Sequence, residues 1–169
     1  MVGLDGVVGA SAALDGRMSL NRAVVQLGGS SLACEVGELG AIALQSVNML
    51  STLIRHEQAL FVQAQQSAAC MASHTVEARL CRWLLRARDL SGRDTLDFTQ
   101  EFLAEMLGVQ RTSVTLSAQT LQQAGLIEYK RGKIHILNVD GLRESVCECY
   151  EAIKGQYDKI SSSPTQGPD

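Results

Sequence analysis

The sequence predicts an α+β fold that is mainly α. First, residues 41–73 contain neither Pro nor Gly and repeat their apolar residues with a helical period. Second, two shorter helical patterns meet at Gly108. Third, short β-like runs flank glycine-containing turns near residues 28–31 and 131–132. A chain of 169 residues fits one domain, or two small ones that share a connecting element.

The N-terminal part is rich in Gly, Ala, Ser and Val and carries two of these β-like runs, at residues 23–27 and 32–36. The intervening Gly28-Gly29-Ser30-Ser31 is typical of a turn. We therefore expect a hairpin or two adjacent strands. Two strands alone bury too little apolar surface to be stable, so they need a helix or further strands to pack on.

Residues 41–73 predict a long helix with an apolar stripe whose positions alternate three and four apart. The stripe is interrupted once by Glu57 and otherwise consists of Val47, Leu50, Ile54, Phe61, Ala64, Ala68 and Met71. A stripe of this length is typical of a helix that packs on another helix, often its own copy in a dimer. The alternative is a long core helix within a monomer.

Further helices are expected on both sides of residues 96–98, which predict a short extended piece. Residues 75–90 place Val76, Leu80, Trp83, Leu84 and Ala87 on one face, with Glu77, Arg79, Arg82, Arg86 and Arg88 mostly elsewhere. Thr99 is placed to cap the next helix. Asp140 is a candidate cap for a helix that runs to about Ile160, and residues 161–169 form a polar tail that we expect to be disordered.

Between Gln100 and Ala124 the spacing of Ala104, Gly108 and Val114 is that of a helix-turn-helix. Ala104 is small where the helices cross, Gly108 permits the positive φ of a tight turn, and Val114 packs the second helix onto the first. Directly afterwards, residues 126–130 and 133–137 flank Arg131-Gly132 and predict a β-hairpin. This order is that of a winged helix; the alternative is a helical hairpin and β-hairpin used for protein contacts.

In such a unit the second helix enters the major groove of DNA, so its outward residues are candidates for base contacts. They are Gln110, Arg111, Thr112, Ser113, Thr115 and Gln119. Arg111 can donate two hydrogen bonds to guanine, and Gln110 or Gln119 can pair with adenine, although solvation alone also explains the glutamines. Backbone contacts are expected from Thr99 and from Lys130, Arg131 and Lys133 at the hairpin tip.

The segment from His74 to Asp140 resembles the DNA-binding half of the Crp/Fnr family of bacterial transcription regulators. The resemblance rests on Leu80-Cys81-Arg82-Trp83-Leu84-Leu85, Thr99-Gln100-Glu101, Ala104-Glu105-Met106-Leu107-Gly108-Val109, Arg111, Leu121-Gln122-Gln123-Ala124-Gly125-Leu126-Ile127 and Arg131-Gly132-Lys133-Ile134. It implies a cyclic-nucleotide-binding-type β-roll, a long dimerisation helix and a winged helix, with double-stranded DNA and RNA polymerase as partners.

Two departures from the family pattern matter. Members that read the best-known half-site carry Glu and Arg where this chain has Thr112 and Leu116, so we expect a different target sequence. About 40 residues can hold only the last strands of a β-roll. Of the family's phosphate-binding residues only Arg22 is plausible, and we expect no cyclic-nucleotide binding; micromolar affinity in calorimetry would contradict this.

Composition limits the other functions. The formal charge is −3, and only residues 74–137 are net positive, with nine basic and seven acidic groups. The first residues lack the basic and apolar stretches of a signal peptide, and no apolar run could span a membrane, so we expect a cytoplasmic protein with no membrane partner. His56, His74 and His135 fall in different elements with no recognisable nucleophile or acid–base partner, so we expect no enzyme.

The five cysteines are expected to be reduced. In the expected C-terminal helix, Cys147 and Cys149 would point to different sides, which disfavours a metal site and leaves redox sensing as the lesser alternative. The N-terminal cysteine cluster of the family's oxygen-sensing branch is absent. We therefore expect no cofactor and no metal.

The predicted organisation has four parts: a partial β-roll remnant (1–40), a dimerisation helix (41–73), a winged helix with a C-terminal helix (74–160) and a tail (161–169). The predicted function is that of a sequence-specific regulator acting as a homodimer on a palindromic site. The alternative is a sensor-less module that pairs with full-length relatives.

Overall fold

The computed structural model describes residues 1–4, 6–15, 18–19 and 21–162, so most of the predicted tail lies outside the described residues. The helices are α1 (Ala10–Asp15), α2 (Val36–Gln45), α3 (Val47–Ser73), α4 (Val76–Ser91), α5 (Gln100–Leu107), α6 (Arg111–Gln123), α7 (Val139–Ser145) and α8 (Cys149–Ser162). The strands are β1 (Thr95–Leu96), β2 (Ile127–Lys130) and β3 (Lys133–Ile136). The predicted mainly helical α+β class is confirmed.

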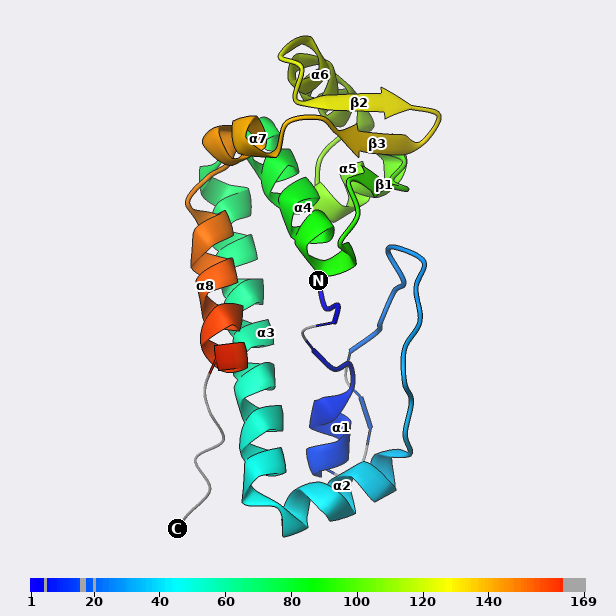
Figure 1. The fold of residues 1–169 in the computed structure, drawn as a ribbon, viewed down its shortest axis with the longest axis vertical. Helices are drawn as coiled ribbons and strands as arrows, with labels where there is room; N and C mark the ends of the chain where they lie inside the picture. Colours follow the sequence, from blue (N-terminus) through cyan, green and yellow to red (C-terminus); the bar gives the residue numbers. More distant parts are fainter. Residues whose placement is uncertain (5, 16–17, 20, 163–169) are drawn as a thin grey trace.

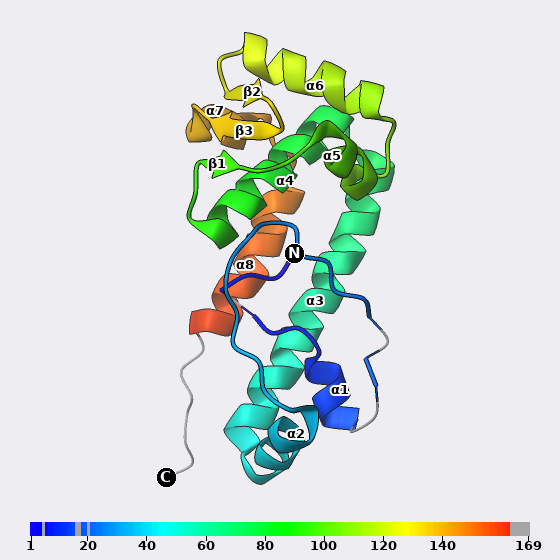
Figure 2. The same ribbon diagram turned by 90° about the vertical axis from the view of Figure 1, so that its right-hand side faces the viewer.

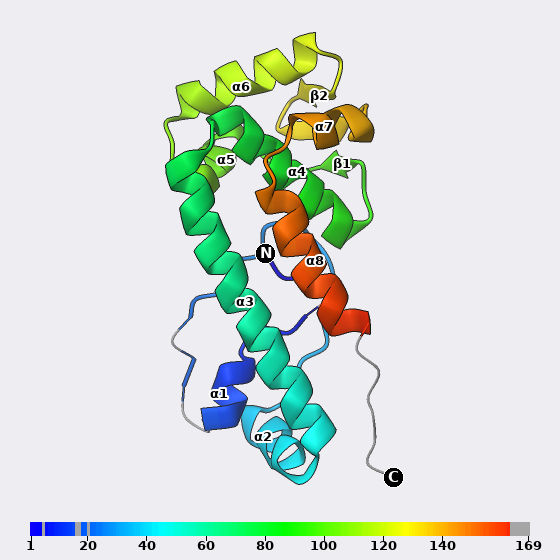
Figure 3. The same cartoon turned by 90° about the vertical axis from the view of Figure 1, so that its left-hand side faces the viewer.

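The molecule is elongated along α3 (Figure 1). Helices α1 and α2 lie at one end, and α4 to α7 with the small sheet lie at the other. Helix α8 runs beside the half of α3 that is nearer to α4, as Figures 1 and 3 show. Helix α6 lies across the far end of the molecule (Figure 2). No described helix is both long and apolar enough to cross a bilayer.

The main core lies around α4. Its buried residues come from α4, α5, α6, α7, α8 and the sheet, and include Leu80, Leu84, Leu103, Leu107, Val114, Leu121, Ile134 and Leu142. The sheet has the order β1-β3-β2 with antiparallel pairing, so the predicted hairpin is present and the extended piece before Thr99 becomes its third strand. This packing fixes the position of α6 and of the hairpin tip.

The expected N-terminal hairpin is wrong. Among the described residues no strand precedes Thr95, and the chain from Asn21 to Glu35 has no regular structure. Val24, Val25 and Leu32 are largely exposed, so these β-prone residues have no partner strand to bury them. Helix α1 forms instead and buries Ala10 against Ala43 of α2 and Leu53 of α3. The division of the chain at residue 40 stays a prediction.

The long helix is divided at Ser46. This residue adopts an extended conformation, and its hydroxyl accepts a hydrogen bond from Met49 N (3.3 Å), which caps α3. Helix α3 buries Leu53, His56, Ala59 and Cys70. The predicted apolar stripe lies on a different face. Four of its members, Val47, Ile54, Phe61 and Met71, are exposed, whereas Leu50 is half-buried. A single chain therefore leaves most of the stripe uncovered.

Three arginines of α4 are buried, which its amphipathic pattern did not indicate. Arg79, Arg82 and Arg86 are each at most 7% exposed, because other elements pack on several sides of α4. Arg79 donates a hydrogen bond to Leu107 O of α5. The Arg86 guanidinium lies 4.4 Å from the centre of the Tyr157 ring, so it connects α4 to α8 through a cation–π contact.

The C-terminal region forms two helices rather than the one expected. Asn138, not Asp140, caps the first, because its Oδ1 accepts from Gly141 N at 2.9 Å. Helix α7 then ends before Val146, and the chain turns toward α3 before α8 begins at Cys149. Tyr150 donates to Asp89 Oδ2 (2.8 Å), and Ile153 and Tyr157 pack on Ala59, so α8 contacts both α4 and α3.

Gly108 offers a test of the helix-turn-helix geometry. It ends α5 with φ +62°, and no heavy atom beyond its chain neighbours lies within 4 Å of a Cβ built there. Gly108→Ala should therefore lower the free energy of unfolding by about 1–2 kcal/mol through backbone strain alone. Urea unfolding measures the difference.

The matched control is Gly155→Ala, within α8 and also in open space. It should raise the free energy of unfolding by about 0.5–1 kcal/mol, because Ala favours a helix interior over Gly. If both substitutions stabilise the protein, the left-handed turn at residue 108 is not formed.

Candidate nucleic-acid interface

Helices α5 and α6 form the predicted helix-turn-helix. Thr99 caps α5, as predicted, by accepting a hydrogen bond from Phe102 N (3.1 Å). After Gly108, Val109 N donates to Ala104 O (3.0 Å), and this closes the turn. Helix α6 then begins at Arg111 with Gln110 as its N-cap residue. Val114 is fully buried against the core, as expected for the residue that joins the two helices.

Helix α6 has two distinct faces. Val114, Ala118 and Leu121 are buried against the core. The opposite face points away from the protein at the end of the molecule (Figure 2). Of the predicted base-reading residues, Gln110, Arg111, Thr112 and Gln119 are exposed, whereas Ser113 and Thr115 are half-buried. A polar, exposed helix face on a packed support is the arrangement that a major groove can receive.

Thr115 has a role within the protein. Its hydroxyl has one hydrogen to donate and two acceptors within reach, Gln100 Oε1 of α5 at 2.8 Å and Arg111 O of its own helix at 3.0 Å. The side chain therefore fixes α6 against α5. Its hydroxyl is already engaged, so it is less available to DNA than the sequence predicted.

The hairpin is attached to the same unit. Tyr129 Oη of β2 accepts from Gln100 N (3.1 Å), and Gln122 Oε1 of α6 accepts from Tyr129 N (2.8 Å). Gln100 thus contacts both the recognition helix and the hairpin. The sequence pattern gave no sign of this, because Gln100 and Tyr129 lie far apart along the chain.

The hairpin tip gathers the three predicted backbone-contacting cations. Lys130 and Lys133 are paired across the strands, and Arg131 between them adopts φ +50°. All three are exposed. Like charges directly opposite each other destabilise a hairpin, and an anion between them would relieve this repulsion. Lys133 Nζ lies 3.4 Å from Asp97 Oδ1, so its charge is partly offset by an exposed pair.

The exposed positive charge is smaller than the sequence suggests. Three of the nine basic residues in the segment 74–137 are the buried arginines of α4. The remaining exposed cations near α6 are Arg111 and the hairpin tip, while Glu101, Glu105 and Glu128 are exposed nearby in sequence. The positive charge available for nonspecific attraction to phosphate is therefore limited.

One residue of the exposed face was not among the predicted contacts. Leu116 is 65% exposed on α6, one turn after Thr112. An exposed leucine on a recognition helix can contact a thymine methyl group. The helical spacing of residues 112, 116 and 119 could have identified it, because these positions share one face.

A second group of functional side chains lies away from α6. Cys70, His74, Cys147 and Cys149 bring one potential ligand atom each to within 4.8 Å of one another. The expectation that Cys147 and Cys149 lie in one helix is wrong. Cys147 lies in the connection between α7 and α8, and Cys149 is the first residue of α8, so both thiols can point to the same place.

Helices α4 to α6 with the three-stranded sheet define a winged helix-turn-helix domain. Residues 78–145 match the family model of the Crp-like helix-turn-helix domain. This part of the chain is therefore a Crp-like helix-turn-helix domain, and the predicted resemblance to the Crp/Fnr family is confirmed. No curated protein sequence matches the chain.

Two solved structures share the fold. One, from Eubacterium rectale, is assigned to the Crp/Fnr family of transcriptional regulators; the match has 23% identity and a TM-score of 0.51 and covers 63% of this chain and 50% of that protein. The other, a CRP-family transcriptional regulator from Thermus thermophilus, has 23% identity and a TM-score of 0.52, with 59% and 54% covered. The chain thus spans about half the length of these proteins.

Proposed function

We propose that the protein is a sequence-specific DNA-binding transcription regulator of the Crp/Fnr type that binds a palindromic site as a homodimer. The observation that carries this proposal is the exposed polar face of α6, whose opposite face is buried in the core of a Crp-like domain. Contact with RNA polymerase stays a prediction of the family resemblance.

Arg111 is the residue we expect to read a base. It is the first residue of α6 and is exposed, so its guanidinium can extend beyond the helix end. A guanidinium donates two parallel hydrogen bonds to guanine O6 and N7, which no other base pair accepts in the same geometry. Lys130 and Arg131 at the hairpin tip carry charge suited to phosphate, which gives affinity without sequence preference.

The exposed members of the α3 stripe support the proposed homodimer. Helix α3 has 27 residues, and a helix of this length is about 40 Å long. Exposed Val47, Ile54, Phe61 and Met71 follow one another along it. Two copies that pair through this stripe are related by twofold symmetry and place two α6 helices on one side of the dimer. A symmetric protein requires a symmetric site, hence the palindrome.

The test of this proposal compares Arg111→Ala with Lys130→Ala on a site selected from a random DNA pool. Arg111→Ala should weaken binding to the selected site by about 1–3 kcal/mol and leave binding to random DNA nearly unchanged. Lys130→Ala should weaken binding to both DNAs equally and flatten the salt dependence. Fluorescence anisotropy titrations at several salt concentrations measure these effects.

Equal losses on both DNAs for Arg111→Ala would contradict the assignment of base contact to Arg111. If no site is enriched from the pool, the protein is not a sequence-specific binder by itself. Gel filtration of a mixture with a full-length relative then tests the second candidate, a dimerisation module, which should elute as a mixed dimer.

A further inference from the structure

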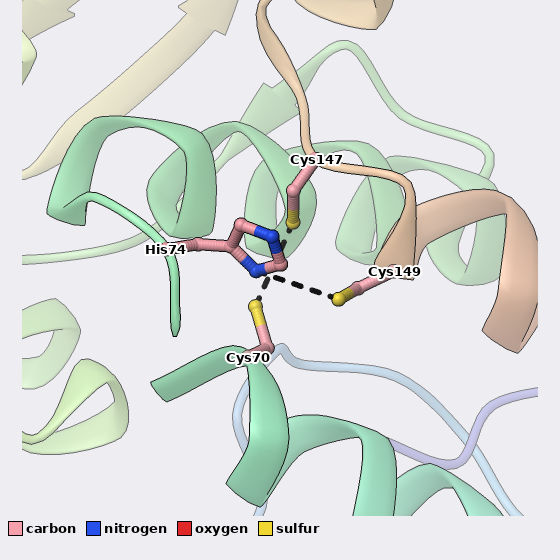
Figure 4. Close-up of side chains that lie close together, drawn as sticks. All are labelled: Cys70, His74, Cys147 and Cys149. Atoms are coloured by element: carbon pink, nitrogen blue, oxygen red, sulfur yellow. Dashed lines mark hydrogen bonds between the residues drawn. The ribbon is translucent and has the colours of Figure 1, made fainter. Parts of the chain in front are cut away.

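Two segments that are distant in sequence meet at the end of α3. Cys70 comes from the last turn of α3, His74 is the C-cap residue of that helix, and Cys147 and Cys149 flank the start of α8 (Figure 4). The three sulfur atoms and the imidazole point toward one another. We infer that these four residues form a zinc site of the Cys3His type. No local sequence pattern in this chain indicates such a site.

The distances fit one tetrahedral ion. Cys70 Sγ lies 3.6 Å from Cys147 Sγ, and Cys149 Sγ lies 3.6 Å from His74 Nδ1. Zinc with Zn–S bonds of about 2.3 Å holds its sulfur ligands about 3.8 Å apart at the corners of a tetrahedron. Small adjustments of side-chain torsions would therefore place all four atoms around a single ion. A disulfide between Cys70 and Cys147 would need its sulfurs about 2.05 Å apart, much closer than they lie.

The histidine is oriented as a ligand. His74 Nε2 lies 3.1 Å from Glu148 Oε1, while Nδ1 faces the sulfur atoms. When Nε2 carries the proton and donates a hydrogen bond to the carboxylate, the lone pair of Nδ1 is free to bind a metal. Histidine ligands of zinc commonly donate their other ring N–H to a carboxylate in this way, which fixes the tautomer and raises the basicity of the ligand nitrogen.

The surroundings favour thiolates that are bound to a cation. All three cysteines are buried, and Gln66 Nε2 donates a hydrogen bond to Cys149 Sγ (3.0 Å). A thiolate in this position needs an opposite charge beside it, and Zn²⁺ supplies two. Binding replaces the thiol protons by the metal and releases them to solvent.

The site's position explains what the ion would do. His74 has an extended backbone conformation between α3 and α4, so it lies at the junction between the long helix and the winged helix-turn-helix domain. Cys147 and Cys149 hold the beginning of α8, which packs on both α3 and α4. An ion shared by these residues would fix the junction and stabilise the folded chain. The site does not depend on DNA binding.

The experiment loads the full-length reduced chain with Zn²⁺ or Co²⁺ after removal of metals by chelation. We expect one ion per chain by elemental analysis, a higher midpoint of thermal unfolding with zinc, and the visible and near-ultraviolet bands of tetrahedral thiolate-bound cobalt. Cys70→Ser, Cys147→Ser and Cys149→Ser should each lose stoichiometric binding. Cys34→Ser and Cys81→Ala, which change the two cysteines outside the cluster, should keep it.

Two further variants keep the test valid if a ligand variant misfolds. His74→Cys should retain one ion per chain and shift the cobalt charge-transfer bands, because a fourth thiolate replaces the imidazole. Glu148→Ala should weaken zinc binding about 10- to 100-fold, as expected for the loss of an outer-shell carboxylate. Glu151→Ala, an exposed carboxylate in the first turn of α8, is its control and should leave the affinity unchanged.

Three outcomes would overturn the inference. The wild-type chain binds no zinc after reduction; or it binds zinc equally well when Cys70 or Cys147 is replaced by Ser; or non-reducing mass spectrometry of the freshly purified chain shows a Cys70–Cys147 disulfide in place of a bound metal. None of these results bears on whether α6 binds DNA, so the two proposals fail separately.

Discussion

Phe61→Glu is expected to convert the homodimer into monomers and to remove high-affinity binding to the palindromic site. Phe61 is 65% exposed in the single chain and lies midway along the apolar stripe of α3. In a symmetric dimer the substitution would place two carboxylates in the seam. Removing an unpaired carboxylate from water costs several kcal/mol. We therefore expect the dissociation constant of the dimer to rise at least 100-fold, which corresponds to about 2.8 kcal/mol.

The matched control is Val62→Glu, the next residue of the same helix, which is 37% exposed and lies outside the stripe. Successive residues of an α-helix point about 100° apart, so this carboxylate should stay in solvent. Sedimentation equilibrium gives the mass of each variant. The proposed stripe is wrong if both variants remain dimeric, or if Val62→Glu dissociates the dimer as readily as Phe61→Glu.

Leu121→Ala is expected to lower the free energy of unfolding by about 2–5 kcal/mol, because it leaves a cavity in a packed core. Leu121 is 1% exposed and lies on the buried face of α6, within the core cluster that includes residues of α4 and α5. Thermal or urea unfolding, followed by circular dichroism, measures the loss. If Leu121→Ala still folds, it should also bind DNA more weakly, because α6 has lost part of its packing against the core.

Leu116→Ala, on the same helix, is the matched control for this loss. Leu116 is 65% exposed, so its truncation should change the free energy of unfolding by no more than about 0.5 kcal/mol. Its expected effect is on affinity for sites with a thymine at the contacted position. If Leu116→Ala destabilises the protein as much as Leu121→Ala, then α6 does not present the face described above.

Much of the winged helix could be predicted from local signals. Thr99 caps α5, Gly108 adopts the left-handed conformation, and Arg131-Gly132 forms the turn of the hairpin, each at the position the sequence indicated. These features depend on the conformational preferences of single residues and on short spacings, which a sequence displays directly. The burial of Val114 followed from the helix-turn-helix spacing in the same way.

The features that the sequence did not reveal depend on tertiary packing. The β-prone residues around Val24 and Leu32 found no partner strand, because strand propensity becomes structure only when another strand is available. Arg79, Arg82 and Arg86 are buried because α4 is covered on several sides, which no amphipathic pattern of one helix could show.

The proposed zinc site could not be predicted from the sequence for a related reason. The backbone leaves the helical conformation between Ser145 and Cys149, and only this break lets Cys147 and Cys149 face Cys70 and His74. A Cys-x-Cys pair read as helical cannot converge on one point, whereas the same pair in a turn can. The remaining ligands lie more than 70 residues earlier, so no local spacing connects them.

The central claim is that two α6 helices enter successive major grooves on one face of a duplex. Methylation interference at guanine N7 on the selected site tests it most directly, because N7 lies in the major groove. The prediction is two symmetric patches of interference whose centres lie about 10 base pairs apart, one helical turn of B-form DNA. The absence of interference at guanine N7, or a single patch bound by a monomer, would contradict it.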